Sequence, residues 1–160
     1  HAHIQSHGGD AGQIFLMGHS AGAYNAAMLA LDRRYLAKVA LGPSVIRGVV
    51  GLAGPYDFLP ITGPTLKLVF AAPDMAETQP INFAHGGAPP MLLMTGDDDD
   101  TVEPRNSESL ARRLGQLGAS AATRVYAGLG HIGIVTALSR AFREKAPVLA
   151  DASQFMRARR

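Results

Sequence analysis

Short apolar runs alternate along this chain with stripes of apolar residues at helical spacing. The runs at residues 14–17, 49–53 and 91–94 have the length of buried strands, and residues 123–127 form a fourth candidate strand. Helical segments separate these runs, so consecutive strands are joined by crossovers and must run parallel. The pattern therefore predicts an α/β fold with one parallel sheet of about four strands, covered by helices on both faces.

Four helical stripes accompany the strands. The first follows the run at residues 14–17, the second lies between the third and fourth runs, and two more follow the fourth run. Their members are Tyr24, Met28, Leu31 and Tyr35; Leu110, Leu114 and Leu117; Val135, Leu138 and Phe142; and Val148, Ala152, Phe155 and Met156. Gly118 is placed to end the second helix, and Pro147 is placed to begin the last.

Residues 54–90 interrupt the alternation. They contain seven prolines and only broken apolar clusters, apart from a short helix predicted at residues 65–72. We interpret this segment as a lid-like insertion over one edge of the sheet. Its aromatic residues either roof a pocket or only pack the insertion onto the domain. These residues are Tyr56, Phe58, Phe70 and Phe83.

Composition and charge exclude several classes of protein. The 160 residues, 47% apolar and 18% charged, can bury one core, so we expect a single domain over residues 1–160. A net charge of +2 is too small to predict nucleic-acid binding. No apolar run approaches the length of a membrane span, and residues 1–9 lack the apolar centre of a signal peptide, so we expect a soluble protein. The lack of cysteine excludes disulfides and thiol nucleophiles.

A G-x-S-x-G motif, Gly18-His19-Ser20-Ala21-Gly22, lies between the first predicted strand and the first predicted helix. This is the strand-turn-helix context of a nucleophilic serine. In such a strained turn, glycines two residues before and two after the serine avoid clashes with its backbone. The hydroxyl of Ser20 then projects clear of the sheet. The alternative interpretation is a serine that only caps the helix.

A serine hydroxyl is a poor nucleophile unless a base takes its proton and an acid orients that base. Residues 97–100 are four aspartates that follow the third strand, and His131 follows the fourth strand between nearby glycines. The carboxyl ends of parallel strands share one edge of a sheet, so these side chains can converge on Ser20. The four aspartates could alternatively bind Ca²⁺, although no glycine or distant glutamate completes a known loop.

The order Ser, Asp, His and the residues around each of them resemble the α/β-hydrolases. The likeness is to the esterase group that includes bacterial carboxylesterases, feruloyl and acetyl-xylan esterases and arylformamidases. It runs through residues 14–26, 51–58, 89–107 and 126–133, and it corresponds to the C-terminal half of that domain. The family pattern around the acid is G-x-x-D-x-x-V, which implies Asp99 as the acid.

The resemblance also implies how the rest of the site is built. The backbone N–H of Ala21, the residue after the nucleophile, is the implied oxyanion donor. No metal and no organic cofactor are implied. We name His19, Tyr56 and Phe58 as candidate substrate-binding residues.

His7-Gly8-Gly9 is similar to the H-G-G stretch that supplies oxyanion donors in this family, but it leads directly into the first strand. We therefore interpret residues 8–10 as a turn after a helix that ends at His7. A zinc site at His1 and His3 is disfavoured, because side chains two residues apart on a helix point apart. On this interpretation the first half of the hydrolase domain is absent, and we expect the isolated chain to be weakly active or inactive.

These patterns predict a serine hydrolase that cleaves a small-molecule carboxylic ester through an acyl-enzyme intermediate. An amide or peptide hydrolase, arylformamidase-like or prolyl-oligopeptidase-like, shares the same motifs and is one alternative. A catalytically inactive fragment or a binding module that retains the motif is another. The acyl and alcohol parts of the substrate, the oligomeric state and the compartment stay open.

Overall fold

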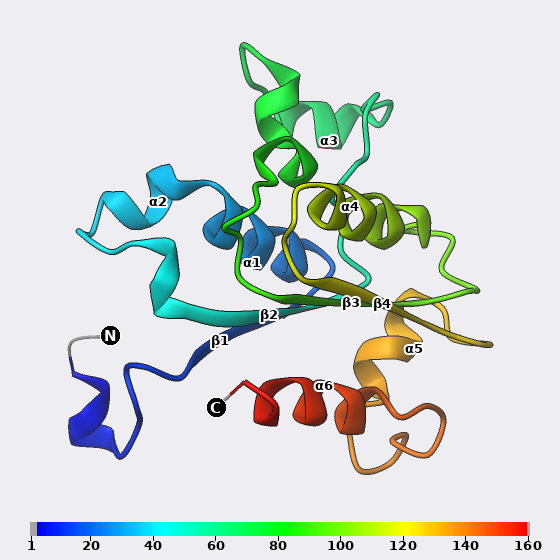
Figure 1. Ribbon diagram of the computed structural model, residues 1–160. Coiled ribbons are helices and arrows are strands. Elements are labelled where there is room, and N and C mark those ends of the chain that lie inside the picture. Colours follow the sequence, from blue (N-terminus) through cyan, green and yellow to red (C-terminus); the bar gives the residue numbers. More distant parts are fainter. Residues whose placement is uncertain (1–2, 160) are drawn as a thin grey trace.

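Four strands form one parallel sheet in the order β1-β2-β3-β4. The computed structural model describes residues 3–159 of the chain (Figure 1). The strands are β1 (Ile14–His19), β2 (Ile46–Leu52), β3 (Met91–Gly96) and β4 (Ala121–Tyr126). Each of the four predicted runs falls largely within one of these strands, so the predicted parallel α/β architecture is confirmed.

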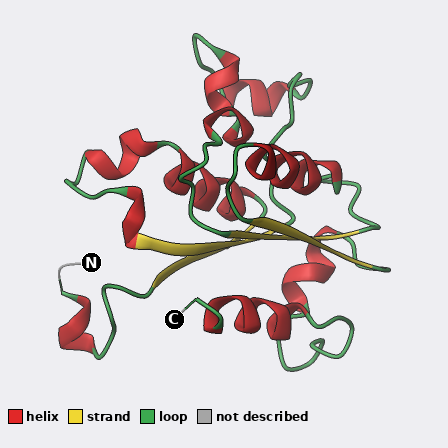
Figure 2. Cartoon of the chain, in the orientation of Figure 1, coloured by secondary structure: helices red, strands yellow, loops and turns green. Residues whose placement is uncertain are grey.

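Helices cover both faces of the sheet, as Figures 1 and 2 show. One face carries α1 (Ala21–Leu31) and α4 (Arg105–Gln116), and the other carries α5 (His131–Thr136) and α6 (Val148–Arg157). A short helix, α2 (Arg33–Ala37), follows α1 directly. No helix in the described part of the chain combines the length and the apolar character needed to cross a membrane.

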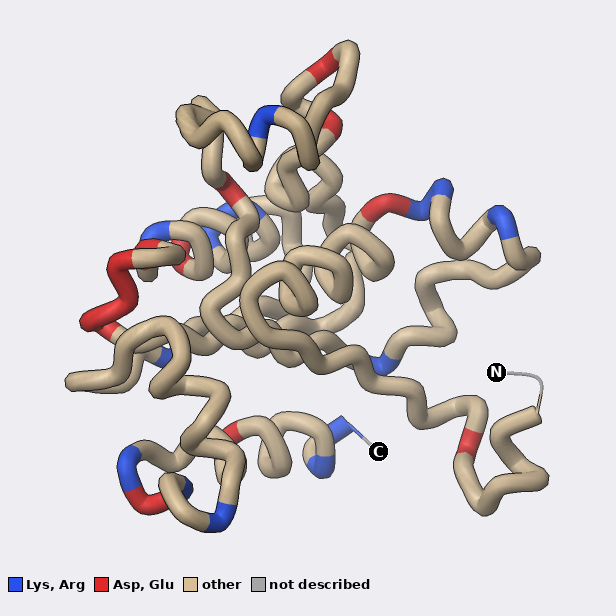
Figure 3. Tube along the Cα trace, turned by 180° about the vertical axis from the view of Figure 1, so that it is seen from behind, with Lys and Arg blue, Asp and Glu red and all other residues tan. Residues whose placement is uncertain are grey.

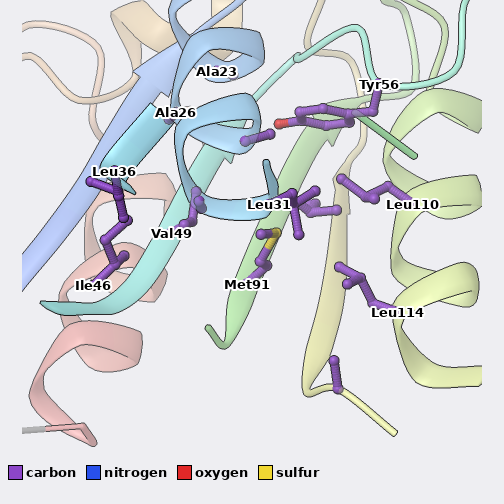
Figure 4. Close-up of a cluster of buried hydrophobic side chains, with 14 residues drawn as sticks. Ala23, Ala26, Leu31, Leu36, Ile46, Val49, Tyr56, Met91, Leu110 and Leu114 are labelled. Atoms are coloured by element: carbon purple, nitrogen blue, oxygen red, sulfur yellow. The ribbon is translucent and has the colours of Figure 1, made fainter. Parts of the chain in front are cut away.

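Two clusters of buried side chains fill the spaces above and below the sheet. Val49, Met91 and Leu93 face α1 and α4, where Leu110 and Leu114 meet them (Figure 4). The alternate strand residues face α5 and α6; among them are Val50, Leu92 and Met94, which pack with Ile134 and Phe155. Successive strand residues point to opposite faces, so burial on both faces explains why the two central strands, β2 and β3, contain continuous apolar runs.

Two of the predicted helical stripes are wrong at their ends. The main chain leaves α1 after Leu31, because the carboxylate of Asp32 accepts the N–H of Arg34 at 3.0 Å and begins α2. Tyr35 therefore lies outside the face of α1 and is 45% exposed. Helix α5 ends at Thr136, and the turns that follow leave Phe142 exposed.

The insertion contains α3 (Pro64–Val69) and two short 3-10 helices, η3 (Met75–Thr78) and η4 (Pro80–Phe83). Helix η4 contacts both α1 and α4. The insertion therefore packs on the outer side of this helix layer (Figure 1). The physical reason is that α1 and α4 offer an apolar surface to which the insertion adds Ile81 and Phe83.

The segment before β1 forms the predicted turn. A 3-10 helix, η1 (Ile4–His7), ends at Gly8, whose φ of 76° is in the left-handed region that favours glycine. The N–H groups of Gly8 and Gly9 donate to the carbonyls of Gln5 and Ile4. His1, one of the two histidines considered for zinc, lies outside the described residues.

The close approach of the β4–α5 loop to β3 makes Gly96 sensitive to substitution. A Cβ at Gly96 would overlap the backbone oxygen of Leu129, whereas one at Gly115 in α4 would meet open space. We expect Gly96→Ala to lower the free energy of unfolding by about 1–3 kcal/mol through overpacking. We expect Gly115→Ala, the matched control, to raise it by about 0.5 kcal/mol, since alanine favours helix. Urea unfolding of both variants measures the free energy of unfolding. An unchanged value for Gly96→Ala would contradict the packing of Leu129 on β3.

Candidate active site

The turn between β1 and α1 holds Ser20 in an unusual backbone conformation. Its φ of 54° and ψ of −121° lie where non-glycine residues are rarely found. Such a conformation costs on the order of 1–3 kcal/mol, so the surroundings must hold it in place. The N–H of Ser20 donates to the carbonyl of Leu52 at 2.8 Å, and its own carbonyl accepts from Tyr24 at 3.0 Å.

The two glycines of the motif differ in what they permit. A Cβ at Gly18 would overlap the backbone of Gly22, because the first turn of α1 folds back onto the end of β1. A Cβ at Gly22 would meet nothing within 4 Å. The predicted need for glycine on steric grounds therefore applies at Gly18 and does not extend to Gly22.

Asp99 is the buried member of the four-aspartate run. Its side chain has no exposed surface, while Asp97, Asp98 and Asp100 are exposed. The Oδ1 atom of Asp99 accepts the N–H groups of Thr101 at 3.1 Å and Val102 at 2.8 Å. These bonds fix the carboxylate at the end of β3.

His131 is the first residue of α5 and bridges the other two side chains. Its Nδ1 lies 2.9 Å from Oδ2 of Asp99, and its Nε2 lies 2.9 Å from Oγ of Ser20. An ionised carboxylate can only accept, so Nδ1 carries the hydrogen, which leaves Nε2 of a neutral ring to accept the Ser20 hydroxyl proton. The structure thus brings Ser20, Asp99 and His131 into one hydrogen-bonded row.

A cavity of about 360 Å³ opens beside Ser20 and Ala21. Its apolar wall comes from α1, the insertion and the loop after β3, and consists of Tyr24, Pro55, Phe58, Leu66, Phe70 and Val102. Three of these rings pack edge to face, with centroids 5.1 Å apart for Phe58 and Phe70, and 5.4 Å apart for Tyr24 and Phe70. Burial, with a smaller effect of Tyr35, raises the pKa of Tyr24 and keeps its hydroxyl neutral.

The rest of the cavity lining is polar. It consists of Asp100, Thr101, Glu103, Arg105 and Asn106, with Nε of Arg105 2.7 Å from Oε2 of Glu103. Figure 3 shows acidic residues gathered at this end of the molecule. Within residues 3–159, no group of three or more His, Asp and Glu side chains is arranged to hold a metal ion.

The model of one protein family, the prolyl oligopeptidase family, matches residues 2–156. The chain belongs to this family. A probable isoprenylcysteine alpha-carbonyl methylesterase of Arabidopsis thaliana is 31% identical over an aligned length of 153, and the match covers 81% of this chain and 32% of the relative. This member of the prolyl oligopeptidase family therefore spans about a third of the length of that relative.

Solved structures place the fold among the α/β-hydrolases. A truncated carbohydrate esterase from gut microbiota matches 99% of this chain and 63% of its own length, with 19% identity and a TM-score of 0.76. Esterase 2 of Thermogutta terrifontis matches 97% of this chain and 59% of its own length, with 18% identity and a TM-score of 0.77. The prolyl oligopeptidase family member described here thus has the predicted α/β-hydrolase fold over part of that domain.

Of the three candidate substrate-binding residues, the structure places only Phe58 on the cavity wall. Tyr56 is completely buried in the core beneath α1, with its hydroxyl against Gly51 and Gly54 (Figure 4). His19 does not line the cavity either; its Nε2 lies 2.8 Å from the carbonyl oxygen of His131. The expectation that Tyr56 contacts substrate is therefore wrong, because its ring fills the space beside Gly51 of β2 and Gly54.

Two buried amides hold the insertion of this prolyl oligopeptidase family member in place, and sequence analysis missed both. Asn106 of α4 joins the insertion to the rest of the domain, whereas Gln79 joins two parts of the insertion to each other. Oδ1 of Asn106 accepts the N–H groups of Tyr56 and Asp57, each at 3.0 Å. Oε1 of Gln79 accepts the N–H of Phe58 at 2.8 Å. Neither residue belongs to a motif, so no local signal in the sequence could have identified them.

The contribution of the two hydrogen bonds that Asn106 accepts can be tested by measuring stability. Asn106→Ala leaves the buried N–H of Tyr56 and the half-buried N–H of Asp57 without their acceptor, and we expect it to lower the free energy of unfolding by about 2–4 kcal/mol. Asn82→Ala removes an exposed side-chain bond to Ala76 and should change it by less than about 0.5 kcal/mol. Thermal and urea unfolding of both variants provide the comparison. Equal losses in the two would show that the Asn106 bonds do not hold the insertion.

Proposed function

We propose that this chain is the catalytic part of a serine hydrolase that cleaves a carboxylic ester through an acyl-enzyme intermediate. The observation that carries the proposal is the hydrogen-bonded row from Ser20 through His131 to Asp99, with 2.9 Å at each of its two closest contacts. In this row the imidazole has a free lone pair aimed at the serine hydroxyl and a carboxylate behind it, which is what activation of a hydroxyl nucleophile requires.

The reaction follows from these positions in two halves. Oγ of Ser20 attacks the ester carbonyl carbon while Nε2 of His131 takes the hydroxyl proton, and Asp99 stabilises the imidazolium that forms. The carbonyl oxygen becomes an oxyanion, for which the backbone N–H of Ala21 at the start of α1 is a donor. The intermediate expels the alkoxide, which takes the proton from His131.

The second half returns the serine to its starting state. His131 takes a proton from a water molecule, and the resulting nucleophile attacks the acyl carbon bound to Ser20. When this tetrahedral intermediate collapses, Oγ of Ser20 leaves and recovers the proton from His131. The products are a carboxylic acid and an alcohol. The imidazole of His131 carries every proton transfer, and Asp99 stays ionised throughout.

The preference for an ester is supported by the proteins that resemble this chain, since the relative and both solved structures are named as esterases. The family description, by contrast, favours peptide substrates and keeps amide hydrolysis as the second candidate. Turnover of an aryl ester compared with the matching aryl amide separates the two, because the same acyl group is offered with two leaving groups.

The cavity beside Ser20 supports a substrate with an apolar group. Tyr24, Phe58 and Phe70 give it an aromatic wall, whereas the loop after β3 gives it acidic groups. Arg105 pairs with Glu103, so Asp100 leaves the charged part of the lining with a net negative charge, and we propose a neutral ester in this site. Phe58, Leu66 and Phe70 all belong to residues 54–90, so we propose that the insertion acts as a lid-like wall of the site.

If Ser20 and His131 act as one unit, the effects of substituting them on turnover should not be additive. We expect Ser20→Ala, His131→Ala and the double variant of the full chain to lose aryl-ester turnover to about the same residual rate. A fluorophosphonate probe should label the unsubstituted chain and fail to label Ser20→Ala. A well-folded chain that the probe does not label would favour the inactive-module alternative, and losses that multiply in the double variant would show two separate steps.

The apolar wall predicts which substitutions change selectivity. We expect Phe70→Ala to lower selectivity for long esters over short ones by about 10-fold, because it removes apolar contact inside the cavity. Leu68→Ala is the matched control two residues before Phe70, since Leu68 is 81% exposed and does not line the cavity. The measurement is kcat/KM for two ester pairs, one lengthened in the acyl part and one in the alcohol part. Equal effects of the two substitutions on selectivity would contradict the proposal that the apolar wall contacts the substrate.

A further inference from the structure

Ser20 and His131 follow strands at opposite ends of the strand order, so the loop that carries His131 has to cross the width of the sheet. Ser20 follows β1 and His131 follows β4, and these are the two outer strands of the described sheet. The β4–α5 loop therefore extends past the ends of the two central strands. A loop that spans this distance needs anchors, because an error of about 1 Å at a catalytic base costs on the order of 100-fold in rate.

The structure anchors one side of this loop to the loop after β3. Oδ1 of Asp97 accepts the N–H of Gly128 at 2.7 Å, and the N–H of Asp98 donates to the carbonyl of Leu129 at 3.2 Å. Both bonds lie on the side of His131 that faces the acid. They fix the approach of the loop to Asp99, but they do not fix its distance from β1.

The anchor on the serine side is His19. Its Nε2 lies 2.8 Å from the carbonyl oxygen of His131, and the two rings pack with centroids 4.8 Å apart and planes at 46°. A carbonyl oxygen can only accept, so Nε2 of His19 carries the hydrogen and donates it. Apart from the bond between Ser20 and His131, this is the one hydrogen bond that joins residues 14–20 to residues 128–136 in the described chain.

We propose that His19 is a positioning residue, whose Nε2–H holds the backbone of His131 so that the His131 ring stays within reach of Ser20. This inference rests on the proposed function of Ser20 and His131. It replaces the expectation that His19 contacts substrate, since His19 is not part of the cavity wall. Because Ser20 follows His19 directly in the chain, one short segment carries both the nucleophile and the anchor for its base.

Two substitutions separate the hydrogen bond from the ring contact. His19→Phe keeps an aromatic ring of similar size and removes the donor, whereas His19→Gln keeps a terminal N–H donor and removes the ring. His7→Gln is the control, because His7 is an exposed histidine of η1 outside the site. Unfolding midpoints of all three variants establish that they are folded.

The first measurement is aryl-ester turnover by the full chain. We expect His19→Phe to lower kcat by about 10- to 100-fold with KM changed by less than about twofold, because the base is misplaced and the cavity is intact. We expect His19→Gln to keep kcat within about threefold of the unsubstituted chain, and His7→Gln to change nothing. A raised KM with unchanged kcat would show that His19 contributes to substrate binding, and it would overturn the proposal.

The second measurement does not depend on catalysis. The Nδ1–H of His131 lies between the ring and the buried carboxylate of Asp99, so its proton signal in the NMR spectrum should be shifted far downfield. We expect this signal to persist in His19→Gln and to broaden in His19→Phe as the ring becomes mobile. An unchanged signal in folded His19→Phe would overturn the anchor even if the chain hydrolyses no ester. If the signal behaves as expected and no ester is cleaved, the anchor stands and the proposed function fails.

Discussion

The arrangement of the site depends on the backbone of Ser20, which turns from β1 into α1 with a positive φ. The turn is held by the bond from its N–H to the carbonyl of Leu52 on the neighbouring strand and by the lack of a Cβ at Gly18. If the turn relaxed, the hydroxyl would swing away from His131 and α1 would leave the sheet. The strain is therefore balanced by the same β1–β2 pairing that builds the sheet.

The parallel sheet brings the other two polar groups to the same place. Strands β1, β3 and β4 each end at one edge of the sheet, and each is followed by one residue of the hydrogen-bonded row. Strand β2 contributes only the carbonyl of Leu52. The contacts that orient these residues come from the loops: backbone N–H groups hold Asp99, while Asp97 and His19 hold the segment that carries His131.

The cavity is built differently from the polar row. Its apolar wall belongs mostly to the insertion, which the buried amide of Asn106 joins to α4 and the buried amide of Gln79 braces from within. The groups proposed for the chemistry and the groups proposed for substrate selection thus lie on separate segments. Substitutions in residues 54–90 can change which substrate fits while the row of Ser20, His131 and Asp99 stays as it is, a division consistent with a fold that hosts many hydrolases.

The sequence by itself determined the strands, the main helices and the order in which Ser20, Asp99 and His131 follow them, because periodicity and turn chemistry are local properties. Only the tertiary structure decided that Tyr56 is a core residue, that His19 contacts the backbone of His131, and that the insertion packs on helices. These outcomes depend on groups far apart in the chain; His19 and His131 are separated by 112 residues. A side chain's partners depend on which distant segment fills the space beside it, and no local pattern carries that information.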